Sequence, residues 1–246
     1  MIVRDIMTTE LITIEPDDTV SHAAHLFCQY QFHHLPVVRD VRGSHSLQVV
    51  PPGQQPTLIF QGLLTTQDVE TAVTLAEAEA SHNPLAHPWQ EQHVAEIMQH
   101  PQVWVTPTTS VAAAAQLLVE RGINCLPVIE PRRIGDQSQN LLVGLLTRSD
   151  ILLALARVLG SFEPGTQISI QLPTGHVTPL ARALLAADEL HVSIGSVVAT
   201  PQEQHTPRQA WLRLSTINPA PLLTRLKQED IEYFIGDTSM EGEHHA

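Results

Sequence analysis

The first 160 residues of the chain repeat one sequence pattern. Three stretches recur at nearly fixed offsets, and the pairs are VRDIM at Val3–Met7 with VAEIM at Val94–Met98, HLPVV at His34–Val38 with CLPVI at Cys125–Ile129, and GLLTTQD at Gly62–Asp68 with GLLTRSD at Gly144–Asp150. Self-similarity of this kind indicates two copies of one supersecondary unit that pack against each other. We therefore expect a cleft between two related halves, with the functional site in that cleft.

The composition excludes several classes of partner and compartment. The 246 residues carry a net charge of −13 at pH 7, and such a surface repels nucleic acid and anionic membranes. No apolar run reaches the roughly 18–20 residues of a membrane span, and the N-terminus has no signal-peptide pattern, so we expect a cytoplasmic protein. Cys28 and Cys125 occupy different positions of the two copies, which favours reduced thiols over a disulfide.

Each copy predicts the same order of elements. A short helix carrying Ile-Met is followed by a short strand, an amphipathic helix, two further strands and a last helix. The early strands are expected at Leu11–Ile14 and Gln102–Val105, the amphipathic helices at Thr19–Tyr30 and Ser110–Glu120, the middle strands at Pro36–Arg39 and Pro127–Glu130, and the last helices from Thr66 and Arg148. The middle strands are joined to the next strands by a long loop in the first copy and a short one in the second.

After Gly160 the pattern changes to the order β-α-β-β-α-β, which is the ferredoxin-like split unit. We therefore expect an α/β (α+β) protein in which two repeats precede a smaller third domain. The expected boundaries are residues 1–76 for the first repeat, 77–92 for a linker, 93–160 for the second repeat, 163–236 for the third domain and 237–246 for a disordered tail.

The strongest chemical signal is the motif Thr-x-x-Asp, which occurs as Thr65/Asp68 and as Thr147/Asp150 after a buried strand. It has two interpretations. In one, the threonine caps a helix and the acid returns to the cap amide, a capping box. In the other, the same aspartate accepts the hydroxyls of a ribose while free amides at the helix start attract phosphate. The duplication favours the second interpretation.

The unit of helix, strand, helix, Leu-Pro-Val and Gly-x-x-Thr-x-x-Asp resembles a CBS domain, and residues 1–160 resemble a tandem CBS pair, or Bateman module. The resemblance implies an adenosyl ligand (AMP, ADP, ATP or S-adenosylmethionine) in the cleft, and no catalytic cofactor. It implies that ribose binds Asp68 and Asp150 and that phosphate lies near Thr65 and Thr147. It also implies an adenine slot whose walls are Ile14, His34 and Pro36 in the first copy and Val105, Cys125 and Pro127 in the second.

The copies depart from the family pattern in ways that predict two unequal sites. A basic residue before the aspartate is replaced by Gln67 and Ser149, and Arg148 can substitute only in the second copy. Gln31 stands where the second copy keeps Gly122 at a helix end, a position that favours a left-handed backbone. With the shorter loop, these differences make Asp150 the better candidate, although an empty second site stays open.

The last 80 residues resemble an ACT domain, and the order of domains resembles the AcuB (acetoin utilisation) family. That resemblance implies a small-molecule turn at Thr174 and Gly175, or a surface used only for dimerisation. We expect a non-catalytic regulatory protein, a homodimer or higher homo-oligomer, that passes ligand state through the ACT-like domain or to an unidentified regulated protein. The alternatives are a constitutive scaffold with an empty cleft and a metal-dependent enzyme using His22, His25, His33 and His34.

Overall fold

The computed structural model describes residues 1–40, 57–80, 88–101, 103–134, 137–162, 164–173, 176–201, 207–216 and 218–236. The chain divides into two compact units, Met1–Ile151 and Leu152–Ala246, so the division falls within one helix, α5. The finer boundaries expected from the sequence stay a prediction. No helix in these described ranges is long and apolar enough to cross a membrane.

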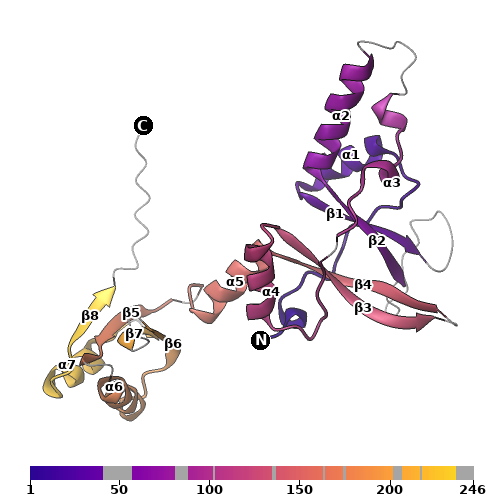
Figure 1. The fold of residues 1–246 in the computed structure, drawn as a ribbon. Helices are drawn as coiled ribbons and strands as arrows, with labels where there is room; N and C mark the ends of the chain where they lie inside the picture. Colours follow the sequence, from indigo (N-terminus) through magenta and orange to yellow (C-terminus); the bar gives the residue numbers. More distant parts are fainter. Residues whose placement is uncertain are drawn as a thin grey trace, which may run out of the picture. The chain divides into compact units, whose positions relative to one another are not determined.

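Unit 1 contains the two copies, and their elements correspond one to one (Figure 1). The first copy comprises η1 (Val3–Asp5), α1 (Val20–Tyr30), β1 (His34–Asp40), β2 (Leu58–Thr65) and α2 (Thr66–Ala80). The segment η2 (Trp89–Glu91) precedes the second copy, which comprises α3 (Val94–Ile97), α4 (Val111–Glu120), β3 (Cys125–Ile134), β4 (Gln137–Thr147) and α5 (Arg148–Val158). The predicted helices and late strands are therefore confirmed.

Local sequence explains where the amphipathic helices begin and end. The hydroxyls of Thr19 and Ser110 cap α1 and α4, because each accepts a hydrogen bond from the backbone N–H three residues later. Short polar side chains at a helix start commonly do this. After these helices the backbone turns left-handed, at Gln31 (φ 55°) and Gly122 (φ 64°). The first copy thus adopts with glutamine the conformation that glycine adopts in the second without a steric cost.

The four late strands of unit 1 form one antiparallel sheet in the order β1-β2-β4-β3. Within each copy the two strands pair along their length, and β2 meets β4 at Ile59 and Leu141. The sheet is therefore continuous across the two copies, with the Pro-containing strand of each copy at an outer edge.

The early strands predicted at Leu11–Ile14 and Gln102–Val105 do not form, and this prediction was wrong for the described residues, with Gln102 outside them. Each is reduced to a single parallel bridge, at Ile14 opposite Val37 and at Val105 opposite Val128. Only Ile14 and Val105 exchange backbone hydrogen bonds with the neighbouring strand. Before these bridges, Leu11, Ile12 and Val103 line a cleft between the two copies.

The two copies exchange their first segments. Val3 at the N-terminus is fully buried in the core of the second copy, together with Leu118 and Leu126. Val94 of the second copy is fully buried in the core of the first, together with Val20 and Leu35. Backbone bonds hold each exchanged segment in place, among them Val3 N–H to Thr109 O at 2.8 Å. Each copy in space is thus assembled from two separated stretches of the chain.

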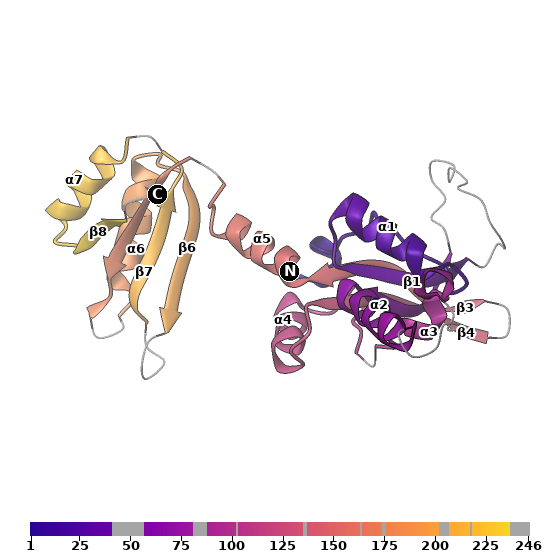
Figure 2. The same ribbon diagram turned by 90° about the horizontal axis from the view of Figure 1, so that it is seen from above.

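Unit 2 has the predicted ferredoxin-like order. Its elements are β5 (Thr166–Gln171), α6 (Thr178–Glu189), β6 (Ile194–Pro201), β7 (Pro207–Leu214), α7 (Ala220–Gln228) and β8 (Tyr233–Gly236). The antiparallel sheet has the strand order β6-β7-β5-β8, and α6 and α7 lie on the same side of it (Figure 2). The assignment of this unit to the ACT family stays a prediction. Thr174, Gly175 and the tail from residue 237 lie outside the described residues.

Candidate functional site

The Thr-x-x-Asp motif forms a capping box in both copies. At the start of α2, the N–H and Oγ1 of Thr65 donate to Asp68 Oδ2 at 2.8 and 2.6 Å, and Asp68 N–H donates back to Thr65 Oγ1 at 3.2 Å. At the start of α5, Thr147 and Asp150 repeat this geometry at 2.7, 2.7 and 3.2 Å. The capping interpretation is thus realised, and it uses only one oxygen of each carboxylate.

The second oxygen of each aspartate meets a residue of the exchanged segment. Gln99 Nε2 donates to Asp68 Oδ1 at 2.6 Å. At the corresponding place in the other half, Thr8 Oγ1 lies 3.4 Å from Asp150 Oδ1. Thr8 and Gln99 occupy equivalent positions of the repeat, directly after Ile-Met. Asp68 and Asp150 therefore share their capping geometry but differ in the side chain that meets their second oxygen.

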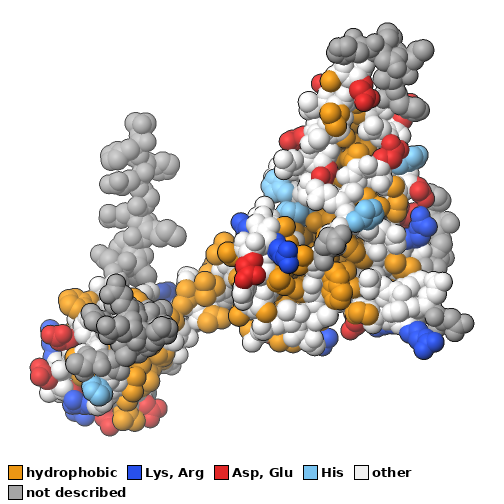
Figure 3. Space-filling view, in the orientation of Figure 1, with side chains coloured by type: hydrophobic (Ala, Val, Ile, Leu, Met, Phe, Trp, Pro, Cys, Tyr) orange, Lys and Arg blue, Asp and Glu red, His pale blue; other side chains and the backbone are white. Residues whose placement is uncertain are grey.

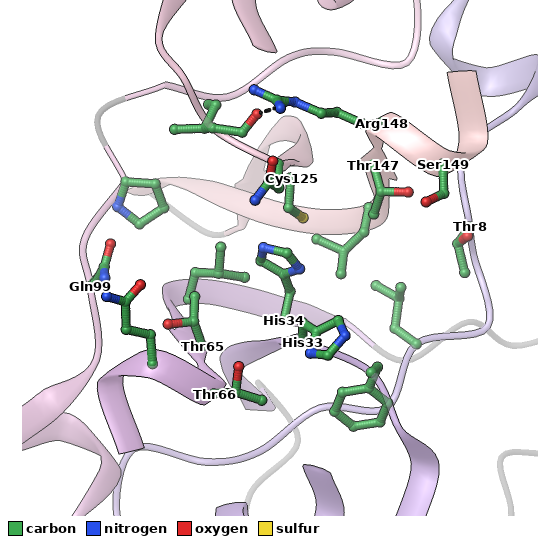
Figure 4. A pocket seen from close by; sticks show the side chains of 18 of the residues that line it. Thr8, His33, His34, Thr65, Thr66, Gln99, Cys125, Thr147, Arg148 and Ser149 are labelled. Carbon is green, nitrogen blue, oxygen red and sulfur yellow. Dashed lines mark hydrogen bonds between the residues drawn. The ribbon is translucent and has the colours of Figure 1, made fainter. Parts of the chain in front are cut away.

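One cleft of about 1020 Å³ runs between the two halves of unit 1, a size that suits a small organic ligand. Both copies line it with equivalent residues (Figure 4). The equivalent pairs are Thr8 and Gln99, Glu10 and Pro101, Ile12 and Val103, Phe32 and Ile123, His33 and Asn124, His34 and Cys125, Leu63 and Leu145, Thr65 and Thr147, Thr66 and Arg148, and Gln67 and Ser149. The cleft predicted from the repeat therefore exists and has pseudo-two-fold walls.

The predicted site residues fall into three groups. Five line the cleft, namely Thr65, Thr147, Arg148, His34 and Cys125. Asp68 and Asp150 lie half-buried in the first turns of α2 and α5, outside the lining itself. The other four are buried behind the walls, where their backbones form the two parallel bridges or flank them: Ile14, Pro36, Val105 and Pro127. The structure brings the first two groups together and separates them from the third.

The two arginines of the cleft differ in their contacts. The Arg148 guanidinium donates to Ile123 O at 3.0 Å, drawn as the dashed line in Figure 4, and to Leu118 O at 3.2 Å. It therefore holds carbonyls at the end of α4, where a cation is favoured. Arg121 also lines the cleft and is exposed, and its guanidinium forms no hydrogen bond or ion pair with the described part of the chain.

Two histidines and a cysteine, His33, His34 and Cys125, also line the cleft. Histidine side chains gather around the middle of the face of unit 1 seen in Figure 3. Burial, together with His33, lowers the pKa of His34 below its ordinary value of 6.5, and the nearby Asp68 opposes the shift. Burial, reinforced by the Asp150 carboxylate, raises the pKa of the Cys125 thiol to about 12. Both side chains are therefore neutral at pH 7.

This environment predicts that the two cysteines react very differently with thiol reagents. Cys28 is exposed on α1, whereas Cys125 is 4% exposed. Because the thiolate is the reactive form, raising a thiol pKa from 9.0 to about 12 lowers its thiolate fraction about 1000-fold at pH 8. We expect Ellman's reagent to titrate one thiol rapidly in the native protein and two after denaturation. Rapid reaction of a native Cys28→Ser variant would contradict this environment for Cys125.

Sequence reasoning missed the apolar walls and the residues that meet the aspartates. Phe32 and Ile123 stand two positions before the predicted His34 and Cys125, so strand alternation could have placed them on the same face. Nothing in the sequence marked Thr8 or Gln99, because their positions beside the aspartates depend on how the copies exchange segments, and nothing marked Arg121 as a residue of the cleft. Within the described residues, no three side chains of His, Cys, Asp or Glu converge as a metal site.

Comparison with known proteins gives one family match on each copy of the repeat. The CBS domain family model matches residues 3–45 and 94–157. The CBS domain-containing protein YhcV of Bacillus subtilis (strain 168) is 27% identical over 149 residues, which cover 61% of this chain and 81% of the relative.

Solved structures give more distant similarities. The structure of CBSX2 in complex with AMP has a TM-score of 0.46 at 23% identity, and the match covers 64% of this chain and 98% of that one. A structure described as an acetoin utilization protein (AcuB) from Vibrio cholerae has a TM-score of 0.44 at 24% identity, with 67% and 98% coverage.

Proposed function

We propose that this chain, which the CBS domain family model matches in both copies of its repeat, is a non-catalytic regulatory protein that binds an adenine nucleotide of the AMP, ADP or ATP type in the cleft of unit 1. One observation carries the proposal. A Thr-Asp pair stands at the start of a helix on each side of a single cleft, and each aspartate keeps one oxygen outside its capping box.

The polar groups at the helix starts match the sugar and phosphate of a nucleotide. A carboxylate oxygen accepts hydrogen bonds from ribose hydroxyls, and charge-assisted bonds of this kind are the stronger ones. The N–H groups of Gln67 and Ser149, the second residues of α2 and α5, have no intrahelical acceptor and form part of the positive end of each helix. These groups would bind ribose and phosphate side by side, as a nucleotide requires.

The remaining walls of the cleft suit an adenine ring. Apolar side chains from both copies, such as Ile12 and Val103, provide flat hydrophobic contact. His34 and Cys125 are neutral and add no charge that the base would have to compensate. Arg121 is the unengaged cation of the lining within the described residues, so we assign it, rather than Arg148, to the phosphate.

A ligand in this cleft would couple the two copies. It would contact residues of both copies, and the exchanged segments already tie each copy to the other's strands. A ligand that binds one arrangement of the halves better than another shifts the population towards that arrangement. We propose that the ACT-like unit, a second copy of the chain or a regulated protein responds to this shift.

A second candidate is a constitutive scaffold with an empty cleft. One oxygen of each aspartate accepts the hydrogen bonds of its capping box, which gives the motif a structural use without any ligand. The third possibility, a metal-dependent enzyme, has no supporting cluster of ligands in the described ranges of the chain. Binding experiments separate these candidates directly.

The experiment is calorimetry on the full chain with AMP, ADP, ATP, S-adenosylmethionine and adenosine. We expect saturable binding of at least one adenine nucleotide. Arg121→Gln should weaken that nucleotide about threefold to tenfold, because it removes one exposed cation from the phosphate, and should leave adenosine unchanged. Arg4→Gln, at an exposed arginine outside the cleft lining, is the matched control. Absence of heat and of any thermal shift with all five compounds would establish the scaffold instead.

A further inference from the structure

We propose that Gln99 closes the half of the cleft at Asp68, so that each chain binds one adenosyl ligand, at Asp150. This inference rests on the proposed function and names the residue that sets its stoichiometry. Its basis is an internal comparison: equivalent backbone bonds hold Gln99 and Thr8 in the two halves, and the two side chains contact the aspartates differently.

The backbone of Gln99 is fixed in the same way as that of Thr8. Gln99 exchanges two backbone hydrogen bonds with Leu63, at 2.8 and 2.9 Å. Thr8 exchanges two with Leu145, at 2.9 and 3.0 Å. In each case a glycine of the strand, Gly62 or Gly144, admits the segment so closely that a Cβ would lie 2.7 or 3.0 Å from its carbonyl oxygen. The backbone therefore brings residue 99 or residue 8 to the same place beside its aspartate.

The two side chains differ in how closely they bind the free oxygen of the aspartate. Gln99 spans the remaining distance and donates to Asp68 Oδ1 at 2.6 Å, a short bond to a charged acceptor. The shorter Thr8 side chain leaves 3.4 Å to Asp150 Oδ1, near the limit of a hydrogen bond. A ribose hydroxyl at Asp68 must displace an amide donor that the chain itself supplies. At Asp150 it displaces only a long contact.

The two side chains beside the aspartates also differ in size. Gln99 lines the cleft and its side chain bonds to Asp68, so it occupies space in which the ribose of a first-copy ligand on Asp68 would lie. Figure 4 shows Gln99 beside Thr65, on the opposite side of the cleft from Thr8 and Ser149. Both the hydrogen bond and the volume of Gln99 thus act against a ligand in the first half.

The test exchanges the residue between equivalent positions. Gln99→Thr places in the first half the side chain that the second half has. For the nucleotide that the wild type binds, we expect calorimetry to change from one ligand per chain to two, with the new event at least about tenfold tighter than any second event of the wild type. Adding Asp68→Ala to Gln99→Thr should remove the new event and keep the first one.

Thr8→Gln is the reciprocal variant and should weaken the single wild-type event about tenfold, because it places an amide donor on Asp150. Two equal ligands per wild-type chain would overturn the inference, as would one ligand per Gln99→Thr chain with an unchanged thermal midpoint. If neither the wild type nor any variant binds an adenosyl compound, the proposed function itself fails. If the wild type binds and Gln99→Thr adds nothing, only the role of Gln99 fails.

Discussion

Asp150→Ala is expected to lower the affinity for adenine nucleotide about 100-fold, whereas Asp68→Ala should change it by less than about threefold. The larger effect follows from removing an acceptor of two ribose hydroxyls, since each bond to a charged group contributes about 1.5–3 kcal/mol. Asp68 already accepts from Gln99, so its loss removes no ligand contact in a chain that binds at Asp150. Titration calorimetry of the two variants against the wild type measures the difference.

Both variants also lose a helix cap, so stability must be separated from binding. Each alanine removes the acceptor of two threonine donors, and loss of a cap costs about 1 kcal/mol. Asp150→Asn is the conservative variant, because an amide keeps one acceptor oxygen at the cap while losing the charge. Equal affinities for the wild type, Asp150→Ala and Asp68→Ala would show that the ligand does not use this motif.

Much of the fold could be predicted because it depends on local pattern. The apolar stripes of α1 and α4, the caps at Thr19 and Ser110, and the β-α-β-β-α-β order all follow from sequence spacing. The early strands could not be predicted correctly. Only Ile14 and Val105 pair with a neighbouring strand, whereas Leu11, Ile12 and Val103 line the cleft. Pairing is a tertiary property and overrides the local pattern.

The residues of the site motif could be predicted from the sequence, but the side chains that surround the motif could not. Thr65, Thr147, His34 and Cys125 lie in the cleft as expected. The sequence offers Arg148 as the substitute for the basic residue before the aspartate, yet its guanidinium bonds to carbonyls at the end of α4. The guanidinium of Arg121, which also lines the cleft, has no partner in the described chain. The direction of a long side chain depends on which carbonyls lie nearby, and sequence position does not contain that information.

The exchanged segments explain why the aspartates could not be judged from their own copy. Asp68 is contacted by a residue that follows α3, and Asp150 by one that follows η1. Each half of the cleft is therefore completed by the other copy. A change in either exchanged segment should be felt by the strands and the aspartate that it covers, and not by the copy to which it belongs in sequence.

Val3→Asp tests this exchange and is expected to destabilise the chain by more than about 3 kcal/mol. Val3 is fully buried among Leu118 and Leu126, and a charge buried there without a partner is among the most destabilising substitutions. Hydrogen exchange should show the loss of protection in α4 and β3 of the second copy. Thr9→Asp, which adds the same charge at an exposed position, is the matched control and should leave stability nearly unchanged.

If Val3→Asp does not fold, Val3→Ala serves the same purpose at an expected cost of about 1–3 kcal/mol. The elements in which hydrogen exchange becomes faster, more than the size of the destabilisation, show which copy the N-terminal segment packs against. Faster exchange in α1 and β1 would mean that the N-terminal segment belongs to the first copy, in contradiction to the packing of Val3. Faster exchange in α4 and β3 would mean that one segment both completes the second core and carries Thr8 to Asp150. Stability of the second copy and access to its ligand site would then depend on the same eight residues.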